Sequence, residues 1–429
     1  MSLVGALADR ALEGVTAAEV ERLRALTTCN LAAAGGQLGA MGELIAALPL
    51  DRERPEHAAF LYAMRLHART QDDFYPAGRV HVGAVTLAVA LALADDCGTR
   101  LAQCLGAGYE VMCAVSATYS GEAQVRGLRP TGVFGPLGAA ASAAVALGLD
   151  RDGVANSIAL AATLAGGTNA AWLAGSDEWL LEAGVAARLG VEAARFTLAG
   201  AHASPQALES RAGWARAFFG DDSARALAST LESAERGIEA VAVKPYPVSG
   251  IAQVPTHLAC AASHCLGAEA ELQRVRIRIS EREAGYPGSA NTGSFVSRSD
   301  ALMSVVFCVT CGLLDGKVRL ERLERPNEPR ALELASRVQL LADPELEETH
   351  AVLELAVDGS EASSQASGAE LLYPAWGRVA AATQEIAARS EASVQLVTAV
   401  RDELLSAEPD AVHLRALLDG EPLRGEASA

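Results

Sequence analysis

Lysine is scarce in this chain, and one copy lies in a segment that could do chemistry. Lysine and arginine together number 35, of which only Lys244 and Lys317 are lysines. Lys244 opens the run Lys-Pro-Tyr-Pro-Val-Ser-Gly at residues 244–250. Because an ammonium loses its proton more readily when it is desolvated, Lys244 could act as an acid or hold one carboxylate as a point charge. The alternative is a surface lysine in a proline-rich linker.

A loop at residues 71–84 gathers acids, a phenol and an imidazole directly before a long apolar run. Its candidate side chains are Asp72, Asp73, Tyr75 and His81. His81 could exchange a proton near neutral pH, with one of the two aspartates orienting it, and the start of the following helix would attract an anion. The alternative is structural: the aspartates cap a turn and His81 packs against the helix.

A second loop, Arg126 to Gly135, places two arginines before an alanine-rich segment. Arg126 or Arg129 could clamp a carboxylate in bidentate fashion. The glycine spacing fits neither a dinucleotide fingerprint nor a P-loop. The loops at 166–170 and 177–179, the latter ending at Trp179, are further candidates, with a solvated helix connection as the alternative.

The eight cysteines are scattered and mostly lie in apolar surroundings, which indicates reduced thiols and no disulfide framework. Cys308 and Cys311 have the spacing of a redox or zinc pair. They lie in the apolar run 301–314 without a second ligand pair, so we expect buried structural cysteines and no metal site.

Composition narrows the class of protein. A formal charge of −18 and a pI near 4.9 argue against nucleic acid or an anionic membrane as a partner. The N-terminal residues do not resemble a secretory signal. The longest apolar stretch, 82–94, is shorter than the roughly 20 residues of a membrane-spanning helix. We therefore expect a cytoplasmic protein that acts on a small molecule.

The elements that must position these loops are mainly helices. Half of the residues are hydrophobic but only 4% are aromatic, which suits closely packed helices. The 429 residues predict about two domains. The patterns predict an N-cap at Asp150, Pro136 at a helix start, and helices over residues 82–94, 101–116, 135–147, 150–164 and 180–198.

The pattern changes at Lys244. Residues 273–280 alternate polar and apolar side chains, which predicts a strand, and 351–357 is a second candidate. Further predictions are helices at 299–314, 328–342, 376–389, 393–406 and 412–418, with a small-residue loop at 359–368. The fold class is therefore mainly α with an inserted α+β domain, divided as 1–243 (helical), 244–372 (α+β lid) and 373–429 (helical return).

Several motifs, taken in order, resemble the MmgE/PrpD family. They are the loop from Asp72-Asp73 to His81-Val-Gly, Arg126-Gly-Leu-Arg-Pro-Thr before Gly135-Pro-Leu-Gly-Ala-Ala-Ala, Leu147-Gly-Leu-Asp, Glu182-Ala-Gly-Val-Ala-Ala-Arg-Leu-Gly and Lys244-Pro-Tyr-Pro. The resemblance covers nearly the whole chain. It implies a large helical domain built from both chain ends, an inserted α+β lid, a cofactor-free site between them and a homodimer.

The resemblance also implies site residues, and this chain departs from several of them. Asp72 or Asp73, His81 and Lys244 match the family's site positions. Other positions differ: Arg129 replaces a histidine, Trp179 stands near a usual lysine, Gln253 stands where a histidine is frequent, and Phe307 where a tyrosine is frequent. These changes remove proton carriers, because arginine keeps its proton at working pH.

The sequence thus favours a cofactor-independent lyase or isomerase that moves a proton at a carbon next to a carboxylate or carbonyl. His81 would carry the proton, Asp72 or Asp73 would orient it, and Lys244 with Arg129 would hold the anionic group, with Tyr75, Tyr246 and Gln253 as further contacts. Two alternatives stay open: a shape-driven cyclase or isomerase of a larger apolar substrate, and a catalytically silent ligand-binding paralogue.

Overall fold

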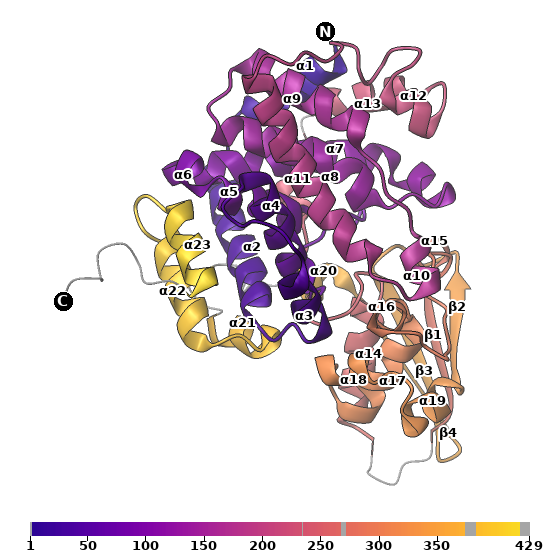
Figure 1. Cartoon of the computed structure of the whole chain (residues 1–429). Coiled ribbons are helices and arrows are strands. Elements are labelled where there is room, and N and C mark those ends of the chain that lie inside the picture. The colour runs from indigo at the N-terminus through magenta and orange to yellow at the C-terminus, as the bar shows by residue number, and fades with distance from the viewer. Residues whose placement is uncertain (1, 234, 267–271, 374–382, 421–429) are drawn as a thin grey trace, which may run out of the picture.

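The computed structural model describes residues 2–233, 235–266, 272–373 and 383–420. Helices dominate these residues, and Figure 1 shows the helical part stacked above a smaller part that contains the sheet. The N-terminal helices are α1 (Leu3–Leu12), α2 (Ala17–Gly35), α3 (Ala40–Ala47), α4 (Pro55–His67), α5 (Val82–Ala92), α6 (Ala94–Cys97), α7 (Leu101–Val125), α8 (Pro130–Ala146), α9 (Arg151–Leu164), α10 (Ala170–Ala174), α11 (Glu178–Leu198), α12 (Trp214–Phe219) and α13 (Ser223–Glu232).

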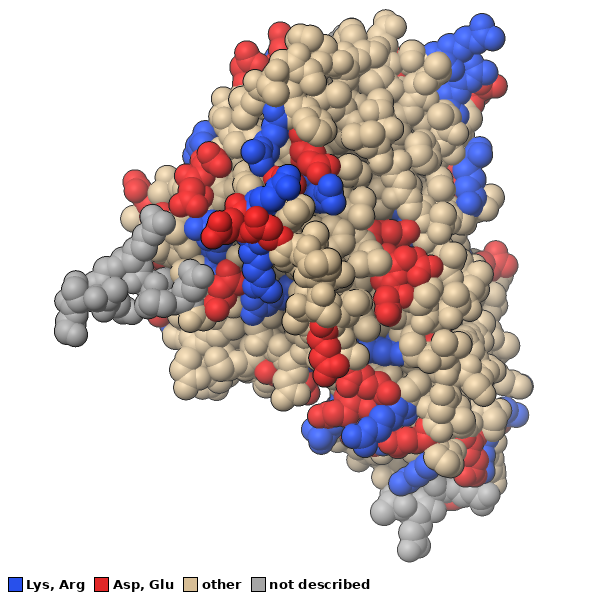
Figure 2. Space-filling view, viewed as in Figure 1, with Lys and Arg blue, Asp and Glu red and all other residues tan. Residues whose placement is uncertain are grey.

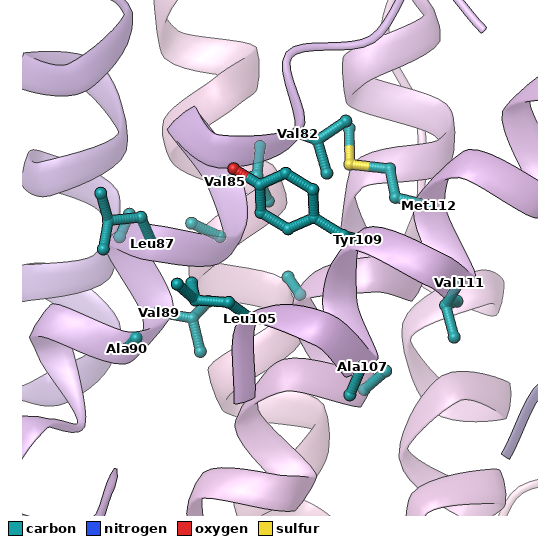
Figure 3. Close-up of a cluster of buried hydrophobic side chains, with 14 of the residues drawn as sticks. Val82, Val85, Leu87, Val89, Ala90, Leu105, Ala107, Tyr109, Val111 and Met112 are labelled. Carbon is teal, nitrogen blue, oxygen red and sulfur yellow. The ribbon is translucent and has the colours of Figure 1, made fainter. Parts of the chain in front are cut away.

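Helix α5 is the centre of the helical part. Every one of its residues is buried, which explains why its sequence is apolar on all sides. It packs against α4, α7, α8 and α11. Figure 3 shows side chains of α5 and α7 around the ring of Tyr109. The long apolar run of the sequence is therefore a core helix that fixes the loop preceding it.

Small residues let the central helices approach closely. A Cβ atom on Gly190 of α11 would lie 2.2 Å from the Cβ of Ala139 on α8, a distance that real Cβ atoms do not tolerate. Alanines on α8 alone therefore do not allow this close approach, and α11 must also carry a glycine at position 190. This packing holds the start of α8, and Arg129 with it, against the rest of the core.

The position of Pro136 differs from the sequence prediction. Helix α8 begins at Pro130, so Pro136 lies inside the helix and not at its start. Proline has no N–H to donate to the carbonyl of Gly132 four residues earlier. That carbonyl instead accepts from the backbone N–H of Gly166 at 3.3 Å. Pro136 therefore leaves a free acceptor that ties the 165–169 loop to the helix.

The C-terminal half carries the sheet. Its elements are α14 (Gln253–Ser263), β1 (Leu272–Ser280), α15 (Glu281–Ala284), α16 (Arg298–Met303), α17 (Val305–Asp315), α18 (Leu320–Glu324), α19 (Pro329–Ala335), β2 (Val338–Asp343), β3 (His350–Val357), β4 (Ser360–Ser367) and α20 (Gly368–Leu372). The strand order is β2-β1-β3-β4, with β1 parallel to β2 and antiparallel to β3. Helices α14 and α17 pack against each other and against the strands.

Strand β1 confirms the alternation seen in the sequence. Val275, Ile277 and Ile279 are buried, whereas the arginines between them are more exposed. Val275 pairs with Val338 of β2 on one side and with Leu355 of β3 on the other. The apolar face of β1 therefore joins the core beneath α14 and α17.

Three predictions for this half are wrong. The expected helix at 328–342 ends with α19, and its second half is strand β2, because those residues pair with β1. The expected loop at 359–368 is the edge strand β4, whose small polar residues pair with β3. The expected helix at 299–314 is broken at Ser304, whose hydroxyl accepts from the Phe307 N–H at 2.9 Å and caps α17.

The last helices return to the helical part. They are α21 (Thr383–Ser390), α22 (Val394–Leu404) and α23 (Ala411–Asp419). They pack against α2, α5 and α6, and Figure 1 shows them beside the indigo N-terminal helices. The first part of the helix expected at 376–389 lies outside the described residues, since the description resumes at Thr383. The mainly helical class with a smaller α+β part is confirmed.

Charges are unevenly spread over the surface. Figure 2 shows a broad uncharged area in the upper part of the view, over α9 and the neighbouring part of α11. Leu164, Phe196 and Leu198 of these helices are exposed. Among the described residues no single helix has the length and apolarity to cross a membrane; residues Val82–Ala92 and Ala94–Val125 meet that test only as a pair bent by 82°.

Gly83 supplies a stability test of the loop that precedes α5. An added Cβ would lie 2.1 Å from Asn30 Nδ2 and 2.6 Å from Asp73 Oδ2, both held in a buried network. We expect Gly83→Ala to destabilise the protein by about 1–3 kcal/mol, since overpacking outweighs the gain in helix propensity. The measurement is the free energy of unfolding in urea.

The matched control is Gly166→Ala, because a Cβ there meets no atom within 4 Å. Its free energy of unfolding is expected to stay within about 0.5 kcal/mol of wild type. Equal unfolding midpoints for both variants would contradict the tight packing around Gly83.

Candidate active site

Four segments that are distant in sequence supply the charged groups of the candidate site. His67 is the last residue of α4, and His81 directly precedes α5. Arg129 precedes α8, and Lys244 lies in the chain between α13 and α14. The loop from 68 to 81 returns by a turn in which Arg79 has a φ of 53° and Tyr75 pairs with Val80. That turn brings His81 back towards His67.

Asp72 is the centre of this group and is completely buried. Both of its oxygens lie 3.1 Å from His67 Nδ1. Oδ2 lies 2.9 Å from His81 Nδ1, and Oδ1 accepts from Lys244 Nζ at 3.1 Å. The side chain of Lys244 is also fully buried, so its ammonium has left water for this carboxylate. The structure brings Asp72, His81, Lys244 and Arg129 together, as the sequence analysis expects of a site.

Mutual charge sets the protonation of these groups. Burial would raise the pKa of Asp72, but His67, Lys244 and His81 hold that pKa well below its usual value. Burial lowers the pKa of Lys244, and Asp72 opposes this effect. Burial, followed by the charges of Lys244 and His67, brings the pKa of His81 well below its usual value. Asp72 is therefore ionised and His81 is neutral around pH 7.

His67 has one consistent arrangement of protons. Arg129 can only donate, so its Nη2 donates to His67 Nε2 at 3.3 Å. His67 must then carry its proton on Nδ1, where Asp72 accepts it. Burial lowers the pKa of His67, which agrees with a neutral ring. Both nitrogens of His67 are thus engaged within the protein.

His81 is arranged differently. Its Nδ1 lies 2.9 Å from Asp72 Oδ2 and 3.2 Å from Lys244 Nζ, while Nε2 has no hydrogen-bond partner among the described residues. If Nδ1 donates to Asp72, Nε2 is a base; if Nδ1 accepts from Lys244, Nε2 carries the proton and is an acid. The same histidine can therefore either take or give a proton at Nε2.

The neighbouring Asp73 points away from this group. It accepts from the Gly83 N–H at 2.7 Å, from Asn30 Nδ2 at 2.9 Å and from the Tyr109 hydroxyl. Burial raises its pKa to about 6, and these donors oppose the rise. Asp73 joins α2, α5 and α7, and it does not line the pocket described next.

A pocket opens in front of His81, between the helical part and the part after residue 243. It encloses about 660 Å³ of empty space, its open mouth included. The lining residues from the helical part are His67, Thr70, Phe74, Pro76, Arg79, His81, Arg129 and Trp172. Those from the later part are Lys244, Ser249, Gly250, Ile251, Glu283, Tyr286, Leu302, Met303, Glu348 and Thr349. A ligand in this pocket would therefore contact both parts of the chain.

Two of the expected aromatic contacts lie outside the pocket lining. Trp179 is fully buried, donates from Nε1 to Ser299 Oγ at 2.9 Å and meets the His67 ring edge to face at 4.9 Å. Phe307 is also fully buried and packs on Phe295. Trp179 therefore supports the lining residues His67 and Trp172, and neither Trp179 nor Phe307 lines the pocket.

The remaining expected residues also lie outside the pocket lining. Arg126 is exposed at the end of α7, and Tyr75 is half-buried in the turn before His81. The Tyr246 hydroxyl lies 3.2 Å from His257 Nδ1. Gln253 is buried and bonds the backbone of Tyr246 and Val248, so it fixes the bend after Lys244.

The sequence analysis missed His67, Trp172 and the groups of the later part that face the site. His67 carries only a weak signal, its position five residues before Asp72 at the end of a helix. Trp172 places its ring 4.9 Å from the Arg129 guanidinium. Glu283 and Glu348 follow β1 and precede β3, and nothing in their local sequence indicates that they face His81.

His67, Asp72 and His81 are also the residues that could hold a metal ion, because one ligand atom from each lies within 4.8 Å of the others. Lys244 Nζ already contacts Asp72 at 3.1 Å and His81 at 3.2 Å. A cation beside this ammonium would be repelled. The arrangement therefore suits an ammonium–carboxylate centre better than a metal centre.

Two comparisons with known proteins bear on the chain. The family model described as the MmgE/PrpD N-terminal domain matches residues 11–227, which include Asp72, His81 and Arg129. The chain is also similar to a cis-aconitate decarboxylase of Homo sapiens, with 28% identity over 318 residues. That match covers 69% of this chain and 63% of the human protein, so less than two thirds of the relative's length is spanned.

Lys244 is expected to control the proton affinity of His81. Removing its charge in Lys244→Met leaves Asp72 with only imidazole partners, so protonation of His81 becomes more favourable. We expect the pKa of His81 to rise towards the ordinary histidine value. NMR titration of histidine-labelled protein measures this directly.

Lys317→Met is the control, because Lys317 is the other lysine and is exposed. It is expected to leave the titration of His81 unchanged. A folded Lys244→Met protein in which His81 titrates as in wild type would show that Lys244 does not hold the imidazole neutral.

Proposed function

This chain belongs to the MmgE/PrpD family, and we propose that it is a lyase or isomerase that moves a proton at a carbon next to a carboxylate or carbonyl. The observation that carries the proposal is His81, which lines the pocket, has Nδ1 2.9 Å from Asp72 Oδ2 and has no partner for Nε2 among the described residues. The similarity to cis-aconitate decarboxylase supports a reaction of the lyase class. The reaction needs no cofactor in this proposal.

In the proposed first step Arg129 holds the substrate carboxylate or carbonyl group. His81 Nε2 removes the proton from the adjacent carbon, and the electron pair of the broken C–H bond moves onto the carbonyl oxygen. Asp72 stabilises the imidazolium through Nδ1, and the ammonium of Lys244 offsets the developing enolate charge.

The fate of the enolate decides the reaction class. Loss of a β-hydroxyl group, which takes the proton from His81 and leaves as water, gives a dehydration. Delivery of the proton to the opposite face of the same carbon gives an epimerisation, and delivery to another carbon of a conjugated enolate gives an isomerisation. In a decarboxylation the C–C bond to the leaving carboxyl group supplies the electron pair, and His81 gives its proton to that carbon. Each outcome uses Nε2 of His81 as the proton carrier.

Deuterium exchange tests the proposal. Purified protein is incubated in D2O with α,β-unsaturated and β-hydroxy acids carrying one, two or three carboxyl groups, cis-aconitate among them, and NMR and mass spectrometry follow exchange and turnover. His81→Ala is expected to lower the rate of the active acid by about 10²–10⁴-fold, the usual contribution of a positioned acid–base group.

His202→Ala is the matched control, because His202 is exposed and lies outside the pocket. It is expected to keep the wild-type rate. A folded His81→Ala protein that turns over substrate at the wild-type rate favours a shape-driven cyclase or isomerase. Absence of exchange and turnover with every acid, in folded wild-type protein, favours a silent ligand-binding paralogue.

A further inference from the structure

The positive charges that line the pocket are not equally available to a ligand. The side chain of Arg79 is nearly buried, with its Nη2 3.1 Å from Glu348 Oε2 and its Nη1 donating to Gln124. Its guanidinium also stacks over the ring of Tyr286 at 5.4 Å. Glu348 in turn accepts from Arg282 at 2.8 Å. Glu348 is thus shared by two guanidinium groups, and Arg79 is held in place by Glu348, Gln124 and Tyr286.

The charge of Lys244 is paired with the buried carboxylate of Asp72. Its ammonium donates to Asp72 at 3.1 Å, and its side chain is fully buried. Breaking this pair for a ligand carboxylate would leave Asp72 buried without its ammonium, which is costly. Lys244 can stabilise a charge that develops beside it, but it is a poor anchor for a second full carboxylate.

Arg129 is the cation of the described lining that keeps binding capacity. Its Nη2 is used by a neutral group, His67, and no acceptor among the described residues reaches Nη1. The nearest carboxylate oxygen, of Glu182, is 3.7 Å from Nε, beyond hydrogen-bond distance. Burial raises the pKa of Glu182, which weakens its claim on the guanidinium. The ring of Trp172 stacks on the Arg129 guanidinium at 4.9 Å and orients it.

Two carboxyl groups of the later part also line the pocket. Glu283 is buried, and its oxygens accept from Ser280 Oγ at 2.7 Å and from the Thr349 N–H at 3.0 Å. Glu348 lies next to Thr349 at the mouth. Glu348 is paired with Arg79 and Arg282, and the oxygens of Glu283 are occupied by their own donors, so neither carboxyl group supplies a donor to a second carboxylate of a ligand.

The rest of the lining is apolar. Phe74, Ile251, Leu302 and Met303 come from both sides of the pocket and surround its middle. Apolar walls stabilise a hydrocarbon chain and leave additional carboxylates without hydrogen-bond donors. The charge pattern and the apolar lining therefore select the same kind of ligand.

We propose that this pocket takes a monocarboxylate with an apolar body, its carboxylate on Arg129, and disfavours di- and tricarboxylates. The inference rests on the proposed function in that it takes this pocket as the substrate site. It narrows the substrate to acids of single charge whose apolar body contacts the apolar lining residues.

Equilibrium binding of three inert six-carbon acids tests the inference. Hexanoate, adipate and tricarballylate carry one, two and three carboxyl groups, and isothermal titration calorimetry measures each Kd at one ionic strength. We expect hexanoate to bind at least about tenfold more tightly than tricarballylate, the size of one charge-assisted hydrogen bond. Arg129→Gln is expected to weaken hexanoate at least about tenfold.

Arg126→Gln is the matched comparison, because Arg126 is exposed three residues before Arg129 and outside the lining. It is expected to bind hexanoate as wild type does. If Arg129→Gln does not fold, Arg129→Lys keeps the charge and is expected to keep the order of the three acids. Glu348→Gln, which frees Arg79, is expected to strengthen adipate relative to hexanoate.

Three results would each overturn the inference: tricarballylate binding as tightly as hexanoate, equal losses of hexanoate affinity in Arg129→Gln and Arg126→Gln, or no binding of any of the three acids. Because the three acids do not react, these results are independent of turnover. If the protein prefers hexanoate but exchanges deuterium into no acid, the inferred ligand class is supported and the proposed function is contradicted. If deuterium exchanges into tricarboxylates and tricarballylate binds tightly, the proposed function is supported and the inferred ligand class is contradicted.

Discussion

The burial of one carboxylate, Asp72, is the constraint on which the site depends. An ionised carboxylate taken out of water costs several kcal/mol unless charges and hydrogen bonds replace its hydration. Asp72 obtains them from His67, His81 and Lys244, which come from the end of α4, the start of α5 and the chain after residue 243. The helical part and the later part must therefore meet for Asp72 to be stable. The same three contacts place His81 and Lys244 against the pocket, so folding and assembly of the site are one event.

The neighbouring carboxylate shows how much depends on side-chain direction. The chain bends at Asp72, and the two adjacent aspartates point to different sides. Asp72 thus faces the pocket groups, whereas Asp73 faces Asn30, Gly83 and Tyr109 in the helical core. One residue sets the electrostatics of the site, and the other fixes the loop that carries it. The sequence did not decide whether Asp72 or Asp73 orients His81, because two adjacent identical residues carry no signal of which one faces the site.

What could be predicted from the sequence followed local signals. The buried helices, strand β1 and the N-cap at Asp150 were readable from periodicity and capping, and Lys244 stood out by rarity. Strands β2 and β4 were missed because pairing with β1 and β3 decides their structure. Trp179 and Phe307 were expected at the ligand but are buried outside the pocket lining, whereas Trp172 lines the pocket. Residue type indicated an apolar site, but only the packing of distant elements assigns each side chain to the surface of the pocket or to its support.

The arginine at position 129 also bears on the class of reaction within the proposed function. By donating to His67 Nε2, it commits the Nδ1 proton of His67 to Asp72 and withdraws that ring from proton transfer. Glu283, across the pocket, has both oxygens occupied by donors. His81 is then the neutral imidazole with a free nitrogen in the described lining. Epimerisation by two bases needs proton carriers on both faces of the carbon, whereas elimination and decarboxylation proceed with one. A permanent cation beside His67 therefore favours a lyase with a single proton carrier over a two-base epimerase.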